Sequence, residues 1–186
     1  MLKELSLHIL DVANNSLSAG AKNLKINVDY QTAKNLLTVE VIDDGKGMDE
    51  EFAKKVTDPF VTTRTTRPVG LGLPFFRQAA EMSGGKLEIN SRRGKGTAVR
   101  ATFLIDSIDR MPMGDLPATV TALINANPSV RYVLGYRVDE REFLFDTDNV
   151  RSILGEVSIS DAEVVAFLKD YIFQGINITN GGSKVL

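Results

Sequence analysis

The stretch LTVEVIDDGKGM, residues 37–48, joins an alternating apolar strand directly to a loop with two acidic residues and two glycines. Leu37, Val39 and Val41 recur with a period of two, which is typical of a strand with one buried face. Asp43 ends that strand, where a buried carboxylate is costly unless it accepts hydrogen bonds. The sequence therefore predicts an interior carboxylate at the start of a glycine-rich loop.

The two glycines of this loop, Gly45 and Gly47, permit a positive φ and a close approach of the backbone to a flat ligand. A hairpin turn is the alternative interpretation, because Asp-Gly is a common turn dipeptide. However, the next segment, DEEFAKKV at residues 49–56, has the pattern of a helix and not that of a second paired strand. The loop is therefore a candidate ligand-binding loop.

Residues 5–19 have the apolar spacing of an amphipathic helix, with Leu7, Leu10 and Leu17 on the expected core face. A polar stripe runs along the opposite face and consists of His8, Asp11, Asn15, Ser18 and Lys22. A solvated helix face is one interpretation. Asp and Asn are poor helix formers, so their presence in the middle of a helix suggests another role. An amide oxygen with a carboxylate one turn away suits a Mg2+ ion that is shared with phosphates.

Residues 57–74, TDPFVTTRTTRPVGLGLP, predict a loop, because their prolines and glycines interrupt any regular element. A helix follows from Gly72 to the stop at Gly84 and Gly85. Glycines at a helix start expose backbone N–H groups to an anion, and phosphate is the obvious one. The threonines and arginines before them suit a lid over phosphates, although an ordinary surface loop is the alternative.

Composition excludes several classes of function. The 186 residues include no Cys and one His, which excludes disulfides, thiol nucleophiles and thiolate metal sites. A net charge of −2 argues against non-specific binding of nucleic acid. We expect a cytoplasmic protein without membrane contact, because no apolar run reaches the length of a membrane span and the N-terminus does not read as a signal peptide.

The rest of the chain predicts further strands and helices. Residues 23–44 and 87–103 each read as an antiparallel hairpin, and a first domain closes at residue 106. A linker at 107–114, a small α/β module at 115–178 and a flexible tail at 179–186 are expected to follow. Within the module we expect helices at 117–126, 148–154 and 161–173 and strands at 130–137 and 141–146.

Five motifs, read in order, resemble the boxes of the histidine-kinase-like ATPases: LDVANNSLSAGA, VIDDGKGM, DPFVTTR, VGLGLPFFRQAAEMSGG and INSRRGKGTAVRATF. The resemblance covers about residues 5–106. It implies the Bergerat fold, an α/β two-layer sandwich in which a mixed, mainly antiparallel sheet packs on helices and ATP binds between them. The small C-terminal α/β module would be appended to this sandwich.

The match to the family's boxes also implies roles for single residues. Asn15 would hold Mg2+, Asp43 would accept the adenine amino group, and Thr97 would support Asp43. The residues that line the base would be Gly45, Gly47 and Met48. The residues around the phosphates would be Thr63, Arg64, Gly70, Leu71, Gly72 and Leu73.

One departure from the family's pattern bears on mechanism. Asp11 stands where hydrolysing members carry Glu, so a catalytic Asp11 would reach water less well and slow hydrolysis is expected. The resemblance implies a Mg-dependent regulatory protein kinase or slow ATPase, and a non-catalytic nucleotide-gated binding module is the alternative. The whole chain resembles small bacterial ATP-binding proteins of this class, and this resemblance implies a hydrogenase-associated or regulatory protein partner. A homodimer is a further alternative.

Overall fold

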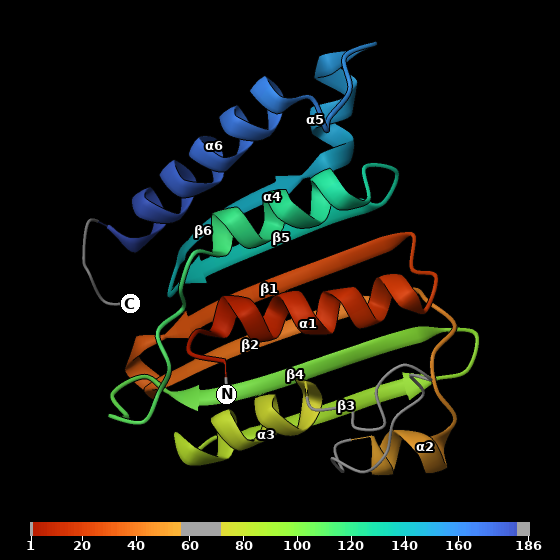
Figure 1. Ribbon diagram of the computed structural model, residues 1–186. Coiled ribbons are helices and arrows are strands. Elements are labelled where there is room, and N and C mark those ends of the chain that lie inside the picture. The colour runs from red at the N-terminus through yellow and green to blue at the C-terminus, as the bar shows by residue number, and fades with distance from the viewer. Residues whose placement is uncertain (1, 57–71, 182–186) are drawn as a thin grey trace.

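A mixed sheet forms one layer of the structure, with six strands in the order β3-β4-β2-β1-β5-β6 (Figure 1). This computed structural model describes residues 2–56 and 72–181. Neighbouring strands are antiparallel except for β1 and β5, which are parallel. The strands are β1 (Asn23–Gln31), β2 (Leu36–Asp43), β3 (Lys86–Arg92), β4 (Gly96–Leu104), β5 (Arg131–Val138) and β6 (Arg141–Asp146).

The second layer consists of helices that cover one face of the sheet (Figure 1). Alternation along the strands explains why one face is covered: Leu24, Ile26 and Val28 of β1 are buried, whereas Lys25 between them is exposed. The fold class, a mainly antiparallel mixed sheet packed on helices, is therefore confirmed. The helices are α1 (Leu5–Ser18), α2 (Glu50–Lys55), α3 (Gly72–Met82), α4 (Leu116–Ala126), α5 (Thr147–Leu154) and α6 (Ala162–Asn180), with a 3-10 turn at Thr32–Lys34.

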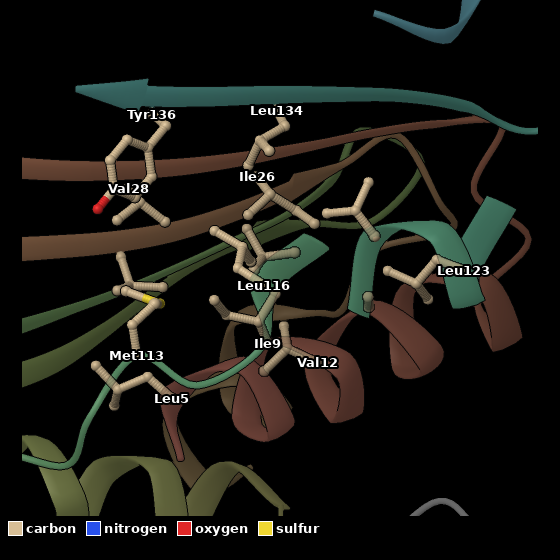
Figure 2. Close-up of a cluster of buried hydrophobic side chains, with 14 of the residues drawn as sticks. Leu5, Ile9, Val12, Ile26, Val28, Met113, Leu116, Leu123, Leu134 and Tyr136 are labelled. Carbon is tan, nitrogen blue, oxygen red and sulfur yellow. The ribbon is translucent and has the colours of Figure 1, made fainter. Parts of the chain in front are cut away.

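The core lies between the sheet and the helices α1 and α4. Figure 2 shows side chains of both helices pointing toward those of β1 and β5. Burying apolar surface at about 25 cal/mol per Å² is the main favourable contribution to such a core. The labelled members are Leu5, Ile9, Val12, Ile26, Val28, Met113, Leu116, Leu123, Leu134 and Tyr136, and all are buried.

The C-terminal part of the chain completes the same sheet. β5 pairs with the free edge of β1 in parallel register, Leu24 opposite Tyr132 and Val28 opposite Tyr136. Residues 115–178, expected as an appended module, therefore share their sheet and core with residues 1–106. The physical reason is that β1 would otherwise leave an unpaired edge beside buried apolar side chains.

The predicted core face of α1 is wrong for Leu7, whereas Leu10 and Leu17 are partly buried against the core as expected. Leu7 is 37% exposed, whereas Leu5, Ile9 and Val12 are buried against the sheet. Apolar spacing places residues on a common helix face but does not say which face meets the sheet. His8 was expected on the polar stripe, and it is buried as well.

The C-terminal helix runs further than expected. Thr179 and Asn180, assigned from the sequence to a flexible tail, belong to the last turn of α6, and Thr179 is buried. Gly181 ends the helix with a left-handed φ of 65°, the usual conformation of a glycine after a helix. Across residues 2–56 and 72–181, no helix is long and apolar enough to cross a membrane.

His8 connects α1 to α3. Its ring stacks on Phe76 with the ring centroids 5.0 Å apart, and neither ring nitrogen has a hydrogen-bond partner in the structure. Burial lowers the pKa of His8 from 6.5 to about 4, because the charged imidazolium would lose its hydration. The folded protein therefore holds a neutral histidine where the unfolded chain binds a proton more readily.

This burial predicts a loss of stability in mild acid. Between pH 6.5 and pH 4 the unfolded chain binds a proton at His8 that the folded chain does not, so the free energy of unfolding falls as the pH falls. From pH 7 to pH 5 the loss should be about 2 kcal/mol. Urea unfolding at both pH values should show a smaller loss in His8→Leu, and an equal loss in both proteins would contradict the assignment.

Candidate functional site

Asp43 occupies a buried position at the end of β2, with 8% of its surface exposed. Its Oδ2 accepts a hydrogen bond of 2.6 Å from the Ser16 hydroxyl of α1. Its Oδ1 accepts a hydrogen bond of 2.8 Å from the backbone N–H of Gly45. Both carboxylate oxygens are thus fixed in direction, as a buried carboxylate requires.

Ser16 is a site residue that sequence reasoning missed. Its Oγ also lies 3.3 Å from the carbonyl oxygen of Val12, so the hydroxyl is held between its own helix and the Asp43 carboxylate. Ser16 is adjacent to Asn15 in the sequence, but adjacency alone does not indicate which of the two faces the sheet. A correct assignment of the buried face of α1 would have found it.

The loop after Asp43 is held from both sides. The Lys46 N–H donates to the Ala19 carbonyl at the end of α1, and the Lys46 carbonyl accepts from the Gly94 N–H in the β3–β4 turn. The N–H of Met48 donates to the Ser91 hydroxyl on β3 at 2.8 Å. The backbone of the loop is therefore tied to α1 and to β3 and β4 together.

Gly47 is required by packing. Its φ is 62°, and a Cβ there would lie 2.1 Å from the carbonyl oxygen of Arg92. Gly45 is less constrained, since a Cβ would lie 3.0 Å from Asp43 Oδ1 and from the carbonyl oxygen of Ala19. The sequence predicted both glycines as ligand-lining residues, and for Gly47 the structure gives a further reason within the fold.

Thr97 lies directly opposite Asp43 across the β2–β4 pair. Its hydroxyl is 2.8 Å from the Ser91 hydroxyl, which in turn receives the Met48 N–H. Neighbouring Gly96 has a φ of 95°, and a Cβ there would lie 1.9 Å from the carbonyl oxygen of Asp43. The hydroxyls of Thr97 and Ser91 thus link β4, β3 and the loop at Met48, and support of Asp43 by Thr97 stays a prediction.

Asp11 and the start of α3 meet at the other end of the site. A Cβ on Gly72 would lie only 1.6 Å from Asp11 Oδ2, so the helix can begin here only with glycine unless the carboxylate moves. Asn15 is one turn after Asp11 on α1 and lies on the same side of that helix. Leu73 is partly buried against the core.

Four predicted site residues, Thr63, Arg64, Gly70 and Leu71, lie outside the described residues. Within residues 2–56 and 72–181, no group of three His, Cys, Asp or Glu side chains could hold a metal ion. Among the described residues, the candidate ligands for a cation at this site are the amide oxygen of Asn15 and the carboxylate of Asp11.

Two hollows among the described residues can be compared with this site. A small one of about 310 Å³ lies between α2, α3 and β3 and includes Ser91 in its lining. A groove of about 1140 Å³ runs between α4 and α6, and none of the predicted site residues lines it. Cavity size therefore does not locate this site, and we place it where the fixed carboxylate, the glycine loop and the start of α3 converge.

Comparisons with known proteins identify relatives that match about half of the chain. Sporulation kinase D of Bacillus subtilis is 29% identical over 99 residues, which are 53% of this chain and 19% of that protein. The nitrogen regulation protein NtrY of Azorhizobium caulinodans is 33% identical over 80 residues, 42% of this chain and 10% of that protein. The chain thus matches no more than a fifth of the length of either relative.

A likeness in fold covers more of the chain. The N-terminal domain of a DNA repair protein superposes with a TM-score of 0.56 at 16% identity, over 83% of this chain and 58% of that one. The family described as histidine kinase-, DNA gyrase B- and HSP90-like ATPases matches residues 1–107. Because this match spans more than half of the chain, the protein belongs to the histidine kinase-, DNA gyrase B- and HSP90-like ATPase family.

Proposed function

We propose that this protein binds ATP with Mg2+ at the site between α1, the loop after β2 and the start of α3, and that it acts as a slow ATPase or a regulatory protein kinase. The observation that carries the proposal is the Asp43 carboxylate, fixed by Ser16 and Gly45 in a chain of this ATPase family.

Selection of adenine follows from the chemistry of Asp43. Each carboxylate oxygen has two acceptor positions, and the two bonds from Ser16 and Gly45 use one on each oxygen. The remaining positions suit an N–H donor such as the exocyclic amine of adenine. Guanine presents an oxo group at that position, which is an acceptor and would face the carboxylate unfavourably.

Binding of the phosphates is supported by the groups at the opposite end of the site. The start of α3 at Gly72 provides backbone N–H groups and the positive end of a helix of 11 residues. The amide oxygen of Asn15 is a ligand of the kind that Mg2+ accepts beside phosphates and water. Bound Mg2+ would neutralise phosphate charge, and Asn15 would be the residue that orients it.

Asp11 is the candidate general base. Its carboxylate lies against Gly72 at the start of α3, where it could accept a proton from water at Oδ2. The Asp side chain is one methylene shorter than the Glu of hydrolysing family members, which favours slow turnover. The same observation favours the second candidate function, a nucleotide-gated binding module with little turnover.

A protein partner is proposed from the relatives. One relative is named as a sporulation kinase and the other as a nitrogen regulation protein, and the matches cover 53% and 42% of this chain. The residues after 107, which lie outside the family match, are the part of the chain on which partner specificity would depend.

Removal of the Asp43 carboxylate should abolish most ATP binding. A hydrogen bond to a charged group contributes about 1.5–3 kcal/mol, so Asp43→Ala should weaken ATP binding by about 10- to 150-fold in calorimetric titration. Asp109→Ala, which removes an exposed carboxylate, is the control and should bind as the parent does. Unchanged ATP affinity in Asp43→Ala would show that the site is placed wrongly.

Ser16 should act on ATP through Asp43. Ser16→Ala removes the donor to Asp43 Oδ2 and should weaken ATP binding by about 5- to 10-fold, less than Asp43→Ala does. Ser18→Ala is a matched control, because Ser18 is two residues further along α1 and its exposed hydroxyl donates to the Asn14 carbonyl. If both serine variants bind ATP equally well, Ser16 does not position the carboxylate.

Asp11 and Gly72 should be coupled in turnover. Asp11→Asn should keep ATP binding and lower phosphate release by about 10²- to 10⁴-fold if Asp11 is the general base. Gly72→Ala should lower turnover by displacing the Asp11 carboxylate, so at saturating ATP the losses of Gly72→Ala and Asp11→Asn should be less than additive in the double variant. Turnover that is unchanged in Asp11→Asn would favour the binding module.

A further inference from the structure

The groove of about 1140 Å³ between α4 and α6 is separate from the candidate nucleotide site. One wall is a single face of α6, because its lining residues recur at intervals of three and four from Ala166 to Asn180. At 1.5 Å per residue this face is about 21 Å long. The opposite wall consists of Glu4 and the segment from Met113 to Pro117, where α4 begins. Figure 1 shows both helices on the covered face of the sheet.

The lining of the groove is largely apolar. Phe173 of α6 lines it and is nevertheless 53% exposed. Met113 and Leu116, which are buried, and Ile176, which packs against the core, line it as well. A ligand that covered the Phe173 ring would therefore gain free energy by removing apolar surface from water.

The charged groups of the groove are mainly acidic. Glu4, Asp115 and Asp170 line it together with one basic residue, Lys169. Lys169 already pairs with Asp115 at 3.2 Å, whereas across residues 2–56 and 72–181 neither Glu4 nor Asp170 forms an ion pair. Two carboxylates of the groove are therefore available to a cation that an occupant supplies.

The C-terminal end of α6 adds to this negative potential. Asn177 and Asn180 line the groove, and the carbonyl groups of a last helical turn carry partial negative charge. The last turn of α6 contains no basic residue that would offset this charge. The groove thus favours a cationic partner and disfavours nucleic acids and anionic membrane surfaces.

The walls of the groove decide the form of the occupant. The long wall is a helix whose backbone groups bond within α6, so it offers side-chain contacts and no strand edge. Another helix suits such a wall, because its own backbone groups are satisfied and its side chains pack between those of α6. The volume of about 1140 Å³ also lies above the range of about 300–1,000 Å³ that is usual for small-molecule sites.

We propose that this groove binds an amphipathic helix of a protein partner, whose apolar face covers Phe173 and whose lysine or arginine side chains reach Glu4 and Asp170. A helix of about 14 residues matches the length of the α6 face. The inference rests on the protein partner proposed above, and it does not depend on ATP binding. Apart from Glu4, the lining residues lie after residue 107, outside the family match.

A second copy of this chain does not supply such a helix. The four described helices of eleven or more residues, α1, α3, α4 and α6, contain two basic residues between them, Arg77 and Lys169. Arg77 pairs with Glu81 on its own helix, and Lys169 pairs with Asp115. None of these helices presents the row of cations that the acidic groove favours, so the partner is a different protein.

Fluorescence anisotropy with a labelled peptide tests the apolar part of the proposal. The probe is a helix of about 14 residues with leucines on one face and lysines on the other. The parent protein should bind this peptide, and Phe173→Ala should weaken binding by about tenfold. Phe167→Ala is the matched control and should bind as the parent does, because Phe167 is exposed on the same helix but does not line the groove.

Charge reversal tests the electrostatic part. Asp170→Lys should weaken binding of the same peptide by about fivefold, because it replaces an attraction by a repulsion. Glu156→Lys makes the same change in net charge at an exposed residue outside the groove and should leave the affinity near that of the parent. A peptide with glutamate in place of lysine should not bind. Far-UV circular dichroism and thermal unfolding of each variant verify that it is folded.

The outcomes separate this inference from the nucleotide site. Calorimetric titration of Phe173→Ala with ATP should give the parent's affinity, whatever that affinity is. A parent that does not bind the lysine peptide would overturn the proposal and leave the ATP site untouched. Equal peptide affinities of the two phenylalanine variants would overturn it too, and so would equal losses in Asp170→Lys and Glu156→Lys, which would show that net charge alone attracts the peptide.

Discussion

The hydrogen bond from Ser16 to Asp43 is the contact around which the site is built. A carboxylate at the buried end of β2 must have its oxygens satisfied, and the Ser16 hydroxyl and the Gly45 N–H do this at 2.6 and 2.8 Å. The bond joins α1 to β2 in the same rotation of the helix that buries Leu5, Ile9 and Val12 against the sheet. With that rotation set, Asp11 and Asn15 lie together on the side of α1 from which α3 begins at Gly72.

Because the helices cover a single face of the sheet, their packing explains where the candidate site lies and why α6 is largely exposed. Every large helix packs on one side, so the candidate site lies where α1 and α3 meet the ends of β2 and β4 (Figure 1). At the other end, α6 has only Leu168, Ile172 and Thr179 fully buried and leaves an apolar flank over β6. The sheet thereby separates a polar site with a fixed carboxylate from the exposed apolar side chains of α6.

Packing also explains departures from simple helix patterns. His8 stacks on Phe76, and its pKa is lowered because the interior between α1 and α3 excludes water. At Gly72 the Asp11 carboxylate occupies the space that a Cβ would take, so any larger residue there would displace that carboxylate. His8, which the sequence placed on a polar helix face, and Gly72, which it placed at a helix start, thus each lie against a residue of another helix.

The sequence by itself determined the element types, the fold class and the family, because alternation and the ordered glycine motifs are local signals. It also placed Asp43 at a buried strand end. Only the tertiary structure decided which face of α1 is buried, that Ser16 contacts Asp43, and that β5 joins β1 in parallel. Periodicity relates residues within an element, whereas these contacts join residues 27 or about 108 positions apart, whose pairing depends on the packing of whole elements.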